Sequence, residues 1–324
     1  MELSNHLHKL KESFGLETFI RRYGIFIVFL VITISLAVSS STFRTPANLI
    51  NILQQNSVYA IVACGMLLMI IVGGFDLSVG AVAALSNVTA AYIFKISSIP
   101  LGIIGGLMLG LLAGVFNGIL ITKARINPFV ATLGSSTLIR GLLFVSTNAE
   151  PIYGLPSSYT VIGMGSIGPV PIAAVIAGLV ILFTLVILHF TLFGHHIFSV
   201  GGNEEAARLA GINVERIKIA TYGIGGFFAA LGGLILLSQS NIGQPSVAEG
   251  LPLTIIAIVV IGGTPLTGGV GNISAPIIGT LMLGVISNGL NLLNASPYWK
   301  PALTGLIVIM AVASERYWAV REKD

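Results

Sequence analysis

Long stretches without a single Asp, Glu, Lys or Arg constrain this chain more than any other feature of its sequence. They occupy residues 23–43, 45–75, 96–122, 151–203, 219–248 and 250–299. A helix needs about 20 mostly apolar residues to cross the hydrocarbon core of a bilayer, so every stretch has room for at least one crossing. Strands of a membrane barrel alternate in polarity, whereas these stretches are apolar throughout. The sequence therefore predicts an all-α integral membrane protein.

The apolar runs predict about ten transmembrane helices, some of them broken or half-helices. The expected ranges are 24–42, 57–73, 78–95, 100–122, 126–146, 170–192, 218–238, 251–264, 272–294 and 299–317. The run at 251–264 is short for a full crossing. It is therefore either a span or a half-helix packed inside the protein.

Basic residues indicate the orientation, because Lys and Arg accumulate in cytoplasmic loops. With the N-terminus inside, 12 of the 16 basic residues are cytoplasmic: Lys9, Lys11, Arg21, Arg22, Lys123, Arg125, Arg208, Arg216, Lys218, Arg316, Arg321 and Lys323. We expect a cytoplasmic segment at 1–22, a single transmembrane domain at 23–318 and a cytoplasmic tail at 319–324. Two longer loops follow from this topology, an outer one at 147–169 and an inner one at 193–217.

The segment Gly73–Gly80 reads GGFDLSVG and places Asp76 between two apolar runs. A carboxylate just before a helix can accept hydrogen bonds from its free N–H groups, and glycines permit a tight turn. We favour a structural cap in a re-entrant turn; a proton or ion site is the alternative.

A second glycine-rich segment, Gly262–Gly271, reads GGTPLTGGVG and echoes the first as GG-x-x-L-[ST]-x-G. Asn117-Gly118 and Asn288-Gly289 form another echo, and both hint at the internal repeats of transporters. No Lys-Ser or Lys-Thr follows the glycines, so a phosphate-binding loop is excluded and ATP hydrolysis is not expected here. The structural motif residues are Gly73, Gly74, Asp76, Ser78, Gly80, Gly262, Gly263, Gly268 and Gly269.

The inner loop contains GGNEEAARLAG at Gly201–Gly211. Asn203 is a good N-cap, acidic residues in the first turn suit the helix dipole, and Gly211 suits the left-handed position after a helix. The pattern predicts a short, rigid helix. On pattern alone it is equally well an ordinary surface helix or a lever for a partner protein.

No catalytic or metal-binding set can be assembled from the remaining reactive residues. His195 and His196 are adjacent and lack the i, i+4 spacing of helical metal ligands. Cys64 is the single cysteine, which excludes an internal disulfide and favours a small buried side chain. We expect no metal and no cofactor bound by this chain.

Five motifs together resemble the permease subunits of bacterial ribose/xylose/galactoside-type ATP-binding-cassette importers. They are GGFDLSVG, NGILITKARINPFVATLG, GGNEEAARLAGI, GGTPLTGGVG and NGLNLL, and the likeness extends from about residue 45 to 318. Phe75 departs from the small aliphatic residue usual there. The resemblance implies that the EAA-x3-G pattern ending at Gly211 is the helix that docks on the ATPase. That helix comprises Asn203, Glu204, Glu205, Ala206, Ala207, Arg208, Leu209, Ala210 and Gly211.

The resemblance also implies a function: a non-catalytic permease subunit that moves a pentose or hexose across the bacterial inner membrane by alternating access. Its implied partners are a cytoplasmic ATPase, a periplasmic sugar-binding protein, a second permease subunit, identical or paralogous, and membrane lipid, but no nucleic acid. A path for a neutral polyol needs uncharged polar groups. Candidates are Asn56, Asn87, Asn117, Gln239, Asn288 and Asn291, each of which could instead hold helices together.

Three alternatives stay open at this point. An ion-coupled secondary transporter would need acids and bases in the membrane, where only Asp76 and Arg140 qualify. A membrane enzyme would need a convergent catalytic set. A permease for another solute, such as an amino acid or nucleoside, differs only in what it carries, and the sequence does not name the sugar.

Overall fold

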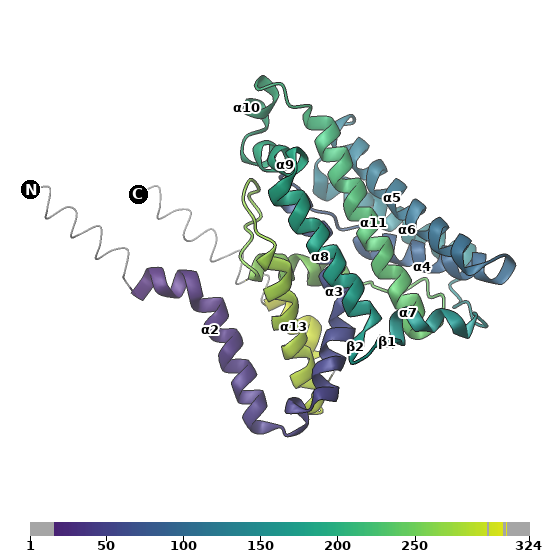
Figure 1. Cartoon of the computed structure of the whole chain (residues 1–324). Helices are drawn as coiled ribbons and strands as arrows, with labels where there is room; N and C mark the ends of the chain where they lie inside the picture. Colours follow the sequence, from purple (N-terminus) through teal and green to yellow (C-terminus); the bar gives the residue numbers. More distant parts are fainter. Residues whose placement is uncertain (1–15, 297, 307–308, 310–324) are drawn as a thin grey trace, which may run out of the picture.

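The computed structural model describes residues 16–296, 298–306 and 309, and these form a helical membrane protein (Figure 1). The larger helices are α2 (Leu16–Ser39), α3 (Pro46–Ile71), α4 (Val79–Ile96), α5 (Ile99–Thr122), α6 (Pro128–Thr147), α8 (Ile172–Phe190), α9 (Leu192–Gly202), α11 (Val214–Ser240), α12 (Leu251–Ile261) and α13 (Ser274–Leu292). The short elements are η1 (Thr42–Arg44), η2 (Ser157–Thr160), α7 (Val161–Met164), β1 (Ser166–Ile167), β2 (Val170–Pro171) and α10 (Glu204–Leu209).

Seven helices in the described part of the chain are long and apolar enough to cross a membrane, namely α3, α4, α5, α6, α8, α11 and α13. Each coincides with one predicted run, which confirms the prediction of a multi-pass helical membrane protein. The predicted run at 57–73 is too short, because α3 already begins at Pro46. The run at 299–317, the segment 1–22 and the tail 319–324 lie largely or wholly outside the described residues.

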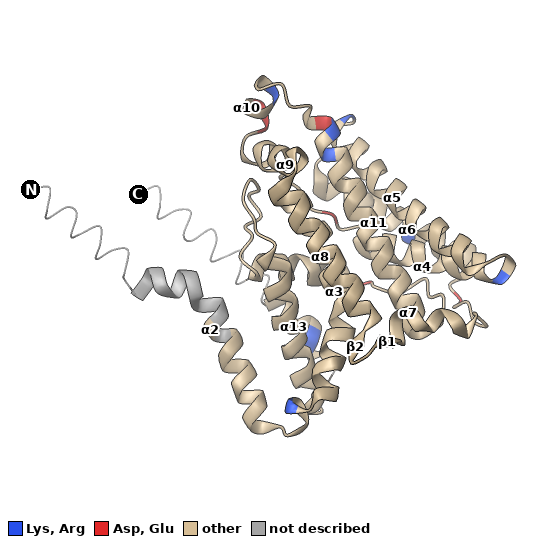
Figure 2. Cartoon of the chain, in the orientation of Figure 1, with Lys and Arg blue, Asp and Glu red and all other residues tan. Residues whose placement is uncertain are grey.

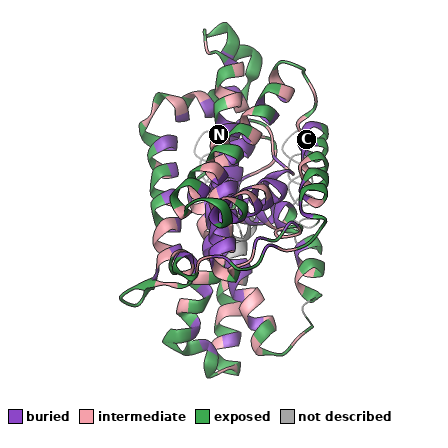
Figure 3. Ribbon diagram, turned by 90° about the vertical axis from the view of Figure 1, so that its right-hand side faces the viewer, coloured by how far each residue is buried: buried purple, intermediate pink, exposed green. Residues whose placement is uncertain are grey.

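Charged residues lie mostly near the helix ends, with Arg140 within α6 as an exception (Figure 2). Helix α3 is the most buried of the membrane-crossing helices, followed by α4 and α11, and buried residues gather at the centre of the molecule (Figure 3). Cys64 on α3 is fully buried there. Helices α5 and α6 expose many large apolar side chains, as expected for surfaces that face lipid.

A stripe of glycines lets α5 approach its neighbours at backbone distance. The stripe repeats every four residues and comprises Gly102, Gly106, Gly110, Gly114 and Gly118, all buried. A Cβ atom on Gly118 would lie 2.7 Å from the Cα of Ile219, and one on Gly110 would lie 2.7 Å from the carbonyl oxygen of Gly226. Small residues at this spacing are the usual device for close packing of membrane helices. Here the first two glycines pack mainly against α4, and the last three join α5 to α11.

The outer loop predicted at 147–169 is folded. It contains η2, α7 and a two-stranded antiparallel hairpin in which Ser166 pairs with Pro171 and Ile167 with Val170. The Tyr159 hydroxyl donates to the Leu234 carbonyl at 2.9 Å, and Ser238 donates to the Tyr159 carbonyl at 2.6 Å. These bonds hold the loop against the far end of α11.

The α3–α4 turn carries Asp76, whose side chain is fully buried. Its Oδ1 accepts from the Ser78 N–H at 2.6 Å, and its Oδ2 accepts from the Asn117 amide at 3.4 Å. Asn117 also donates to the Ser78 hydroxyl at 2.8 Å. The N-cap position of α4 belongs to Ser78, so Asp76 does not cap the helix as expected; it closes the turn two residues earlier.

Neighbouring helices fix this turn from two further sides. The Thr132 hydroxyl on α6 accepts from the Leu77 N–H at 3.1 Å, and the Tyr222 hydroxyl on α11 donates to the Phe75 carbonyl at 3.2 Å. Together with Asn117 on α5, these bonds satisfy backbone groups that water cannot reach.

We predict that Asp76→Asn retains the fold whereas Asp76→Leu loses it. The amide oxygen can still accept from Ser78, but leucine leaves the buried donors of Ser78 and Asn117 with fewer acceptors, at about 1–3 kcal/mol for each lost partner. Reaction of the buried Cys64 thiol during thermal unfolding in detergent would report the difference. A Leu variant as stable as the wild type would contradict this role. An Asn variant that is stable but does not transport at any pH would instead indicate a role for the charge.

Candidate functional site

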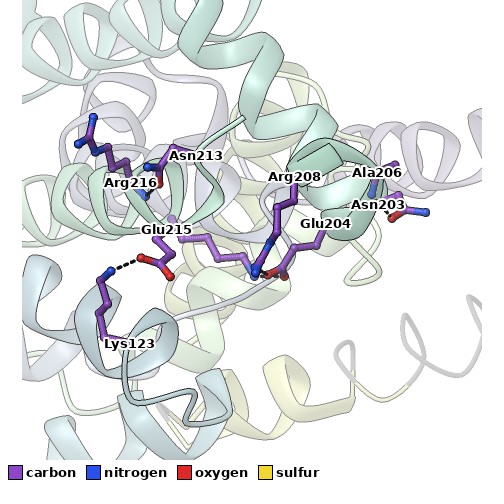
Figure 4. Close-up of polar contacts among 9 residues, drawn as sticks. Lys123, Asn203, Glu204, Ala206, Arg208, Asn213, Glu215 and Arg216 are labelled. Carbon is purple, nitrogen blue, oxygen red and sulfur yellow. Dashed lines mark hydrogen bonds and ion pairs between the residues drawn. The ribbon is translucent and has the colours of Figure 1, made fainter. Parts of the chain in front are cut away.

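Helix α10 is capped at both ends, and Figure 4 shows the N-terminal cap between Asn203 and Ala206. The Asn203 side chain accepts from the Ala206 N–H at 2.9 Å. At the other end Gly211 has φ = 84°, and the N–H groups of Gly211 and Ile212 donate to the carbonyls of Arg208 and Ala207. This is the two-bond C-terminal cap that a left-handed glycine permits. The helix thus occupies the range that the sequence predicted for it.

One ion pair joins α10 to the start of α11, and two further pairs lie beside it (Figure 4). Glu204 lies 2.6 Å from the Lys218 ammonium and 3.2 Å from the Arg208 guanidinium. The hydrogen bond from Lys218, followed by the charges of Lys218 and Arg208, lowers the pKa of Glu204 below its usual value despite partial burial. One turn away, Glu215 pairs with Lys123 at the end of α5. Helix α10 is therefore fixed to the bundle by charge as well as by a short connection.

The outward face of α10 combines small and apolar side chains. Ala206 and Ala210 are exposed, and Leu209 is 85% exposed. Ala207 is only 4% exposed because it faces the chain's own core. Of the residues in the implied docking helix, Ala207 is therefore not accessible to a partner, while Leu209 offers an apolar contact that the sequence pattern did not single out.

The two glycine-rich motifs end α3 and α12 in the same way. The N–H groups of Gly73 and Gly74 donate to the carbonyls of Ile70 and Met69, with Gly73 at φ = 89°. After α12, Gly263 at φ = 99° and Thr264 repeat the pattern on Val260 and Val259. Gly73 therefore corresponds to Gly263 in the structure, whereas the sequence echo aligns Gly73 with Gly262. The two correspondences differ by one residue.

The remaining motif glycines mark close approaches. A Cβ on Gly262 would overlap the backbone of Ala275, and one on Gly80 would lie 3.1 Å from the Cδ of Pro252. Gly268 and Gly269 both have positive φ and contact the ends of α3 and α9. The structure thus brings the two motifs together in space.

A cavity of about 800 Å³ lies between α3, α11, α12, α13 and the helical residues 299–306. On α11 it is lined by residues near the end remote from α10, and on α3 by residues near the start, so it lies in the half of the molecule remote from α10. Its polar lining consists of Gln55, Asn56, Tyr59, Gln239, Glu249, Thr254, Ser287, Asn288, Lys300 and Thr304.

Three of the six predicted path residues line this cavity: Asn56, Gln239 and Asn288. Asn288 also holds helices together, since it exchanges two hydrogen bonds with Asn48 on α3, at 2.7 and 3.0 Å. Asn291 is exposed and lies outside the cavity.

The other two predicted path residues are buried away from the cavity. Asn87 donates to the Gly233 carbonyl at 3.3 Å and accepts from the Gln244 N–H at 2.8 Å. Asn117 serves the Asp76 turn described above. Both therefore hold elements together, which is the usual role of polar residues between membrane helices.

One wall of the cavity is a segment without regular structure, residues 241–250, which runs inward to the start of the half-helix α12. Gly243 forms a bridge with Ile152, and Arg140 on α6 donates to the carbonyls of Pro245 and Val247 at 2.6 and 3.0 Å. Irregular backbone at membrane depth is tolerated where it is buried in protein or lines a cavity. Helix α12 has 11 residues, which at about 1.5 Å per residue are too few to cross the hydrocarbon core, so its length favours a half-helix.

Sequence reasoning missed Tyr59 and Lys300, which meet in the cavity. The Lys300 ammonium lies 3.1 Å from the Tyr59 hydroxyl and 5.0 Å from the centre of its ring. No local pattern connects residues so far apart in the chain. Within the described residues, no cluster of His, Cys, Asp and Glu could hold a metal ion.

Known proteins resemble this chain over most of its length. It is 38% identical to the ribose import permease protein RbsC of Bacillus subtilis over 299 residues, which cover 91% of this chain and 93% of the relative. It is 41% identical to RbsC of Escherichia coli K12, covering 88% and 91% of the two chains. The L-arabinose transport system permease protein AraH of the same strain is 38% identical, covering 95% and 94%.

No solved structure matches this chain. Residues 48–312 match the family described as "Branched-chain amino acid transport system / permease component", and this range includes every membrane-crossing helix from α4 to α13 and most of α3. The chain therefore belongs to this family of transport-system permease components.

Proposed function

We propose that this chain is the membrane subunit of an ATP-driven importer that carries a pentose such as ribose or arabinose into a bacterial cell. The observation that carries the proposal is the cavity of about 800 Å³, whose lining is rich in uncharged amides and hydroxyls. Such groups can replace the hydration of a neutral polyol without binding it too tightly to leave. The names of the ribose and arabinose permeases that resemble the chain support the same substrate class.

Energy enters through α10 in this proposal. The chain offers no phosphate-binding loop, so ATP hydrolysis is assigned to a separate cytoplasmic subunit that docks on the exposed face of α10. A sugar-binding protein delivers the solute on the opposite side, which is nearer the cavity. A second permease subunit completes the path. No cofactor is assigned to this chain.

A branched-chain amino acid is the second candidate substrate. The family description names this class, and the cavity holds both Glu249 and Lys300, which could bind an ammonium and a carboxylate. Lys300 is already engaged by Tyr59, however, and the uncharged groups outnumber the charged ones. The sugar is therefore preferred.

We further propose that both termini and α10 are cytoplasmic, since 12 of the 16 Lys and Arg residues then lie inside. In a Cys64→Ser background, an impermeant thiol reagent added to intact spheroplasts should modify Ser157→Cys and spare Ala206→Cys. Both positions are exposed, so access from each side alone decides the result. Labelling of Ala206→Cys only would reverse the orientation.

Measurements of solute uptake by cells test which substrate the transporter carries. Cells that lack their own ribose and arabinose importers should take up labelled ribose or arabinose when they receive this chain with its ATPase and binding protein. Excess unlabelled pentose should compete and excess leucine should not. Competition by leucine alone would favour the amino acid. Uptake that survives ATP depletion but is abolished by an uncoupler would favour ion coupling.

A matched pair of variants locates the path in the same assay. Gln239→Leu removes a hydrogen-bonding group from the cavity and should lower uptake roughly two- to tenfold, the equivalent of one net hydrogen bond. Asn291→Leu makes the same kind of change outside the cavity and should leave uptake unchanged. Equal effects of both variants would contradict this path.

We predict that Leu209→Glu separates the ATPase from the permease. A charge at the exposed apolar position of α10 would have to be desolvated on docking, and loss of a central contact typically weakens association by about 2 kcal/mol, or roughly 30-fold. Co-purification of the ATPase measures the effect. Ile167→Glu in the outer hairpin, also at an exposed apolar position, is the control. Normal co-purification of the Leu209 variant would place docking elsewhere.

A further inference from the structure

Three segments that are distant in sequence contact one another through glycine residues, so that backbone packs directly against backbone. They are the end of α3, the end of α9 and the loop between α12 and α13. A Cβ on Gly268 would lie 2.9 Å from the Cα of Gly73, and one on Gly269 would lie 2.6 Å from the Cα of Gly202. We call this contact the glycine junction, formed by Gly73, Gly201, Gly202, Gly268 and Gly269.

Gly201 lies at the centre of the junction. A Cβ on Gly201 would overlap the carbonyl oxygen of Ile71 and would lie 2.7 Å from the nitrogen of Gly269. That same nitrogen donates to the Ile71 carbonyl at 2.8 Å. One hydrogen bond between α3 and the α12–α13 loop therefore lies directly against the last turn of α9.

Backbone contact of this kind transmits displacement efficiently. Close-packed groups resist compression, and the junction offers no side-chain rotamers that could absorb a shift of one segment against another. The positive φ angles of Gly73, Gly268 and Gly269 fix the turns in conformations that other residues rarely adopt. A movement of α9 thus displaces the other two segments with it.

The junction connects the docking helix to the walls of the cavity. Gly202 ends α9, and the next residue, Asn203, caps α10. On the other side of the junction, α3, α12 and α13 all line the cavity. The fourth wall, α11, is joined to α10 by the pair of Glu204 and Lys218.

We propose that the glycine junction carries the movement of α10 to α3, α12 and α13, and that Gly201 is its central positioning residue. This inference rests on the proposed function, in which an ATPase acts on α10. It adds the route by which the force passes to the cavity. This route runs through a backbone contact at the end of α9 as well as along α11.

Two adjacent glycines provide a matched test. Gly201→Ala places a methyl group against Ile71 and Gly269, whereas Gly202→Ala places one in open space. Both substitutions lie in the last turn of α9 and change helix propensity equally. We expect Gly201→Ala to retain the co-purifying ATPase but to lose ribose-stimulated ATP hydrolysis at least fivefold, within the roughly 5- to 150-fold range of typical coupling. Gly202→Ala should resemble the wild type.

A second measurement does not depend on the sugar. In a Cys64→Ser background, Ser287→Cys places a thiol in the cavity wall on α13. Its rate of modification should change when ATP and vanadate are added to the assembled transporter. Gly201→Ala should abolish that change and Gly202→Ala should preserve it. If the wild type shows the change but transports neither ribose nor arabinose, the substrate proposal fails while the junction stands.

A cross-link covers the case in which Gly201→Ala does not fold. Gly202→Cys and Val270→Cys, both exposed and on the two sides of the junction, can be joined by a short bis-methanethiosulfonate reagent. Segments that move together should keep ATP-driven uptake when linked. Loss of uptake that dithiothreitol reverses would overturn the proposal, because the segments would then have to separate. Normal coupling in Gly201→Ala would overturn it as well.

Discussion

In a bilayer, apolar side chains gain little by exchanging lipid for a protein neighbour, so helices associate mainly where their backbones can approach closely. The glycine stripe of α5 meets this requirement along its whole length, and it positions α11 at the centre of the molecule. The other features depend on that placement. Helix α11 is joined to α10 at one end by the pair of Lys218 and Glu204, supports the folded loop at 147–169 at the other end and lines the cavity with Gln239.

The second constraint is that backbone groups at membrane depth must find partners inside the protein. The segment 241–250 satisfies it with unusual donors and acceptors, among them the Asn87 amide and the Arg140 guanidinium. This gives Arg140 a structural reason to lie within α6, where a charge is otherwise expensive. It also leaves one wall of the cavity as irregular backbone that starts the half-helix α12.

Much of this arrangement could be predicted from local sequence. The limits of α10 follow from Asn203 and Gly211, because capping depends only on neighbouring residues. The start of α3 was missed although Thr45 and Pro46 signal it, since the amides from Asn51 to Asn56 weaken the apolar pattern. The burial of Ala207 could not be predicted, because it depends on how α10 packs against distant parts of the chain, among them Lys218, which pairs with Glu204. The pairing of Lys300 with Tyr59 likewise depends on the folded arrangement of two separate helices.

The glycine stripe of α5 also has a consequence for membrane insertion, because α5 is synthesised long before α11. Helix α5 is complete at Thr122, but its partner α11 begins only at Val214 and ends at Ser240. At about 5–20 residues per second, the ribosome needs on the order of ten seconds to supply it. During that interval the part of the stripe that will meet α11 waits in the membrane, while α6 and α8 are already made. Helices α6 and α8 must not pack against the part of the α5 glycine stripe that later contacts α11. Their bulky, lipid-exposed side chains, such as Leu142 and Phe183, disfavour such packing, because they cannot fit as closely into a row of glycines as the backbone of α11 does.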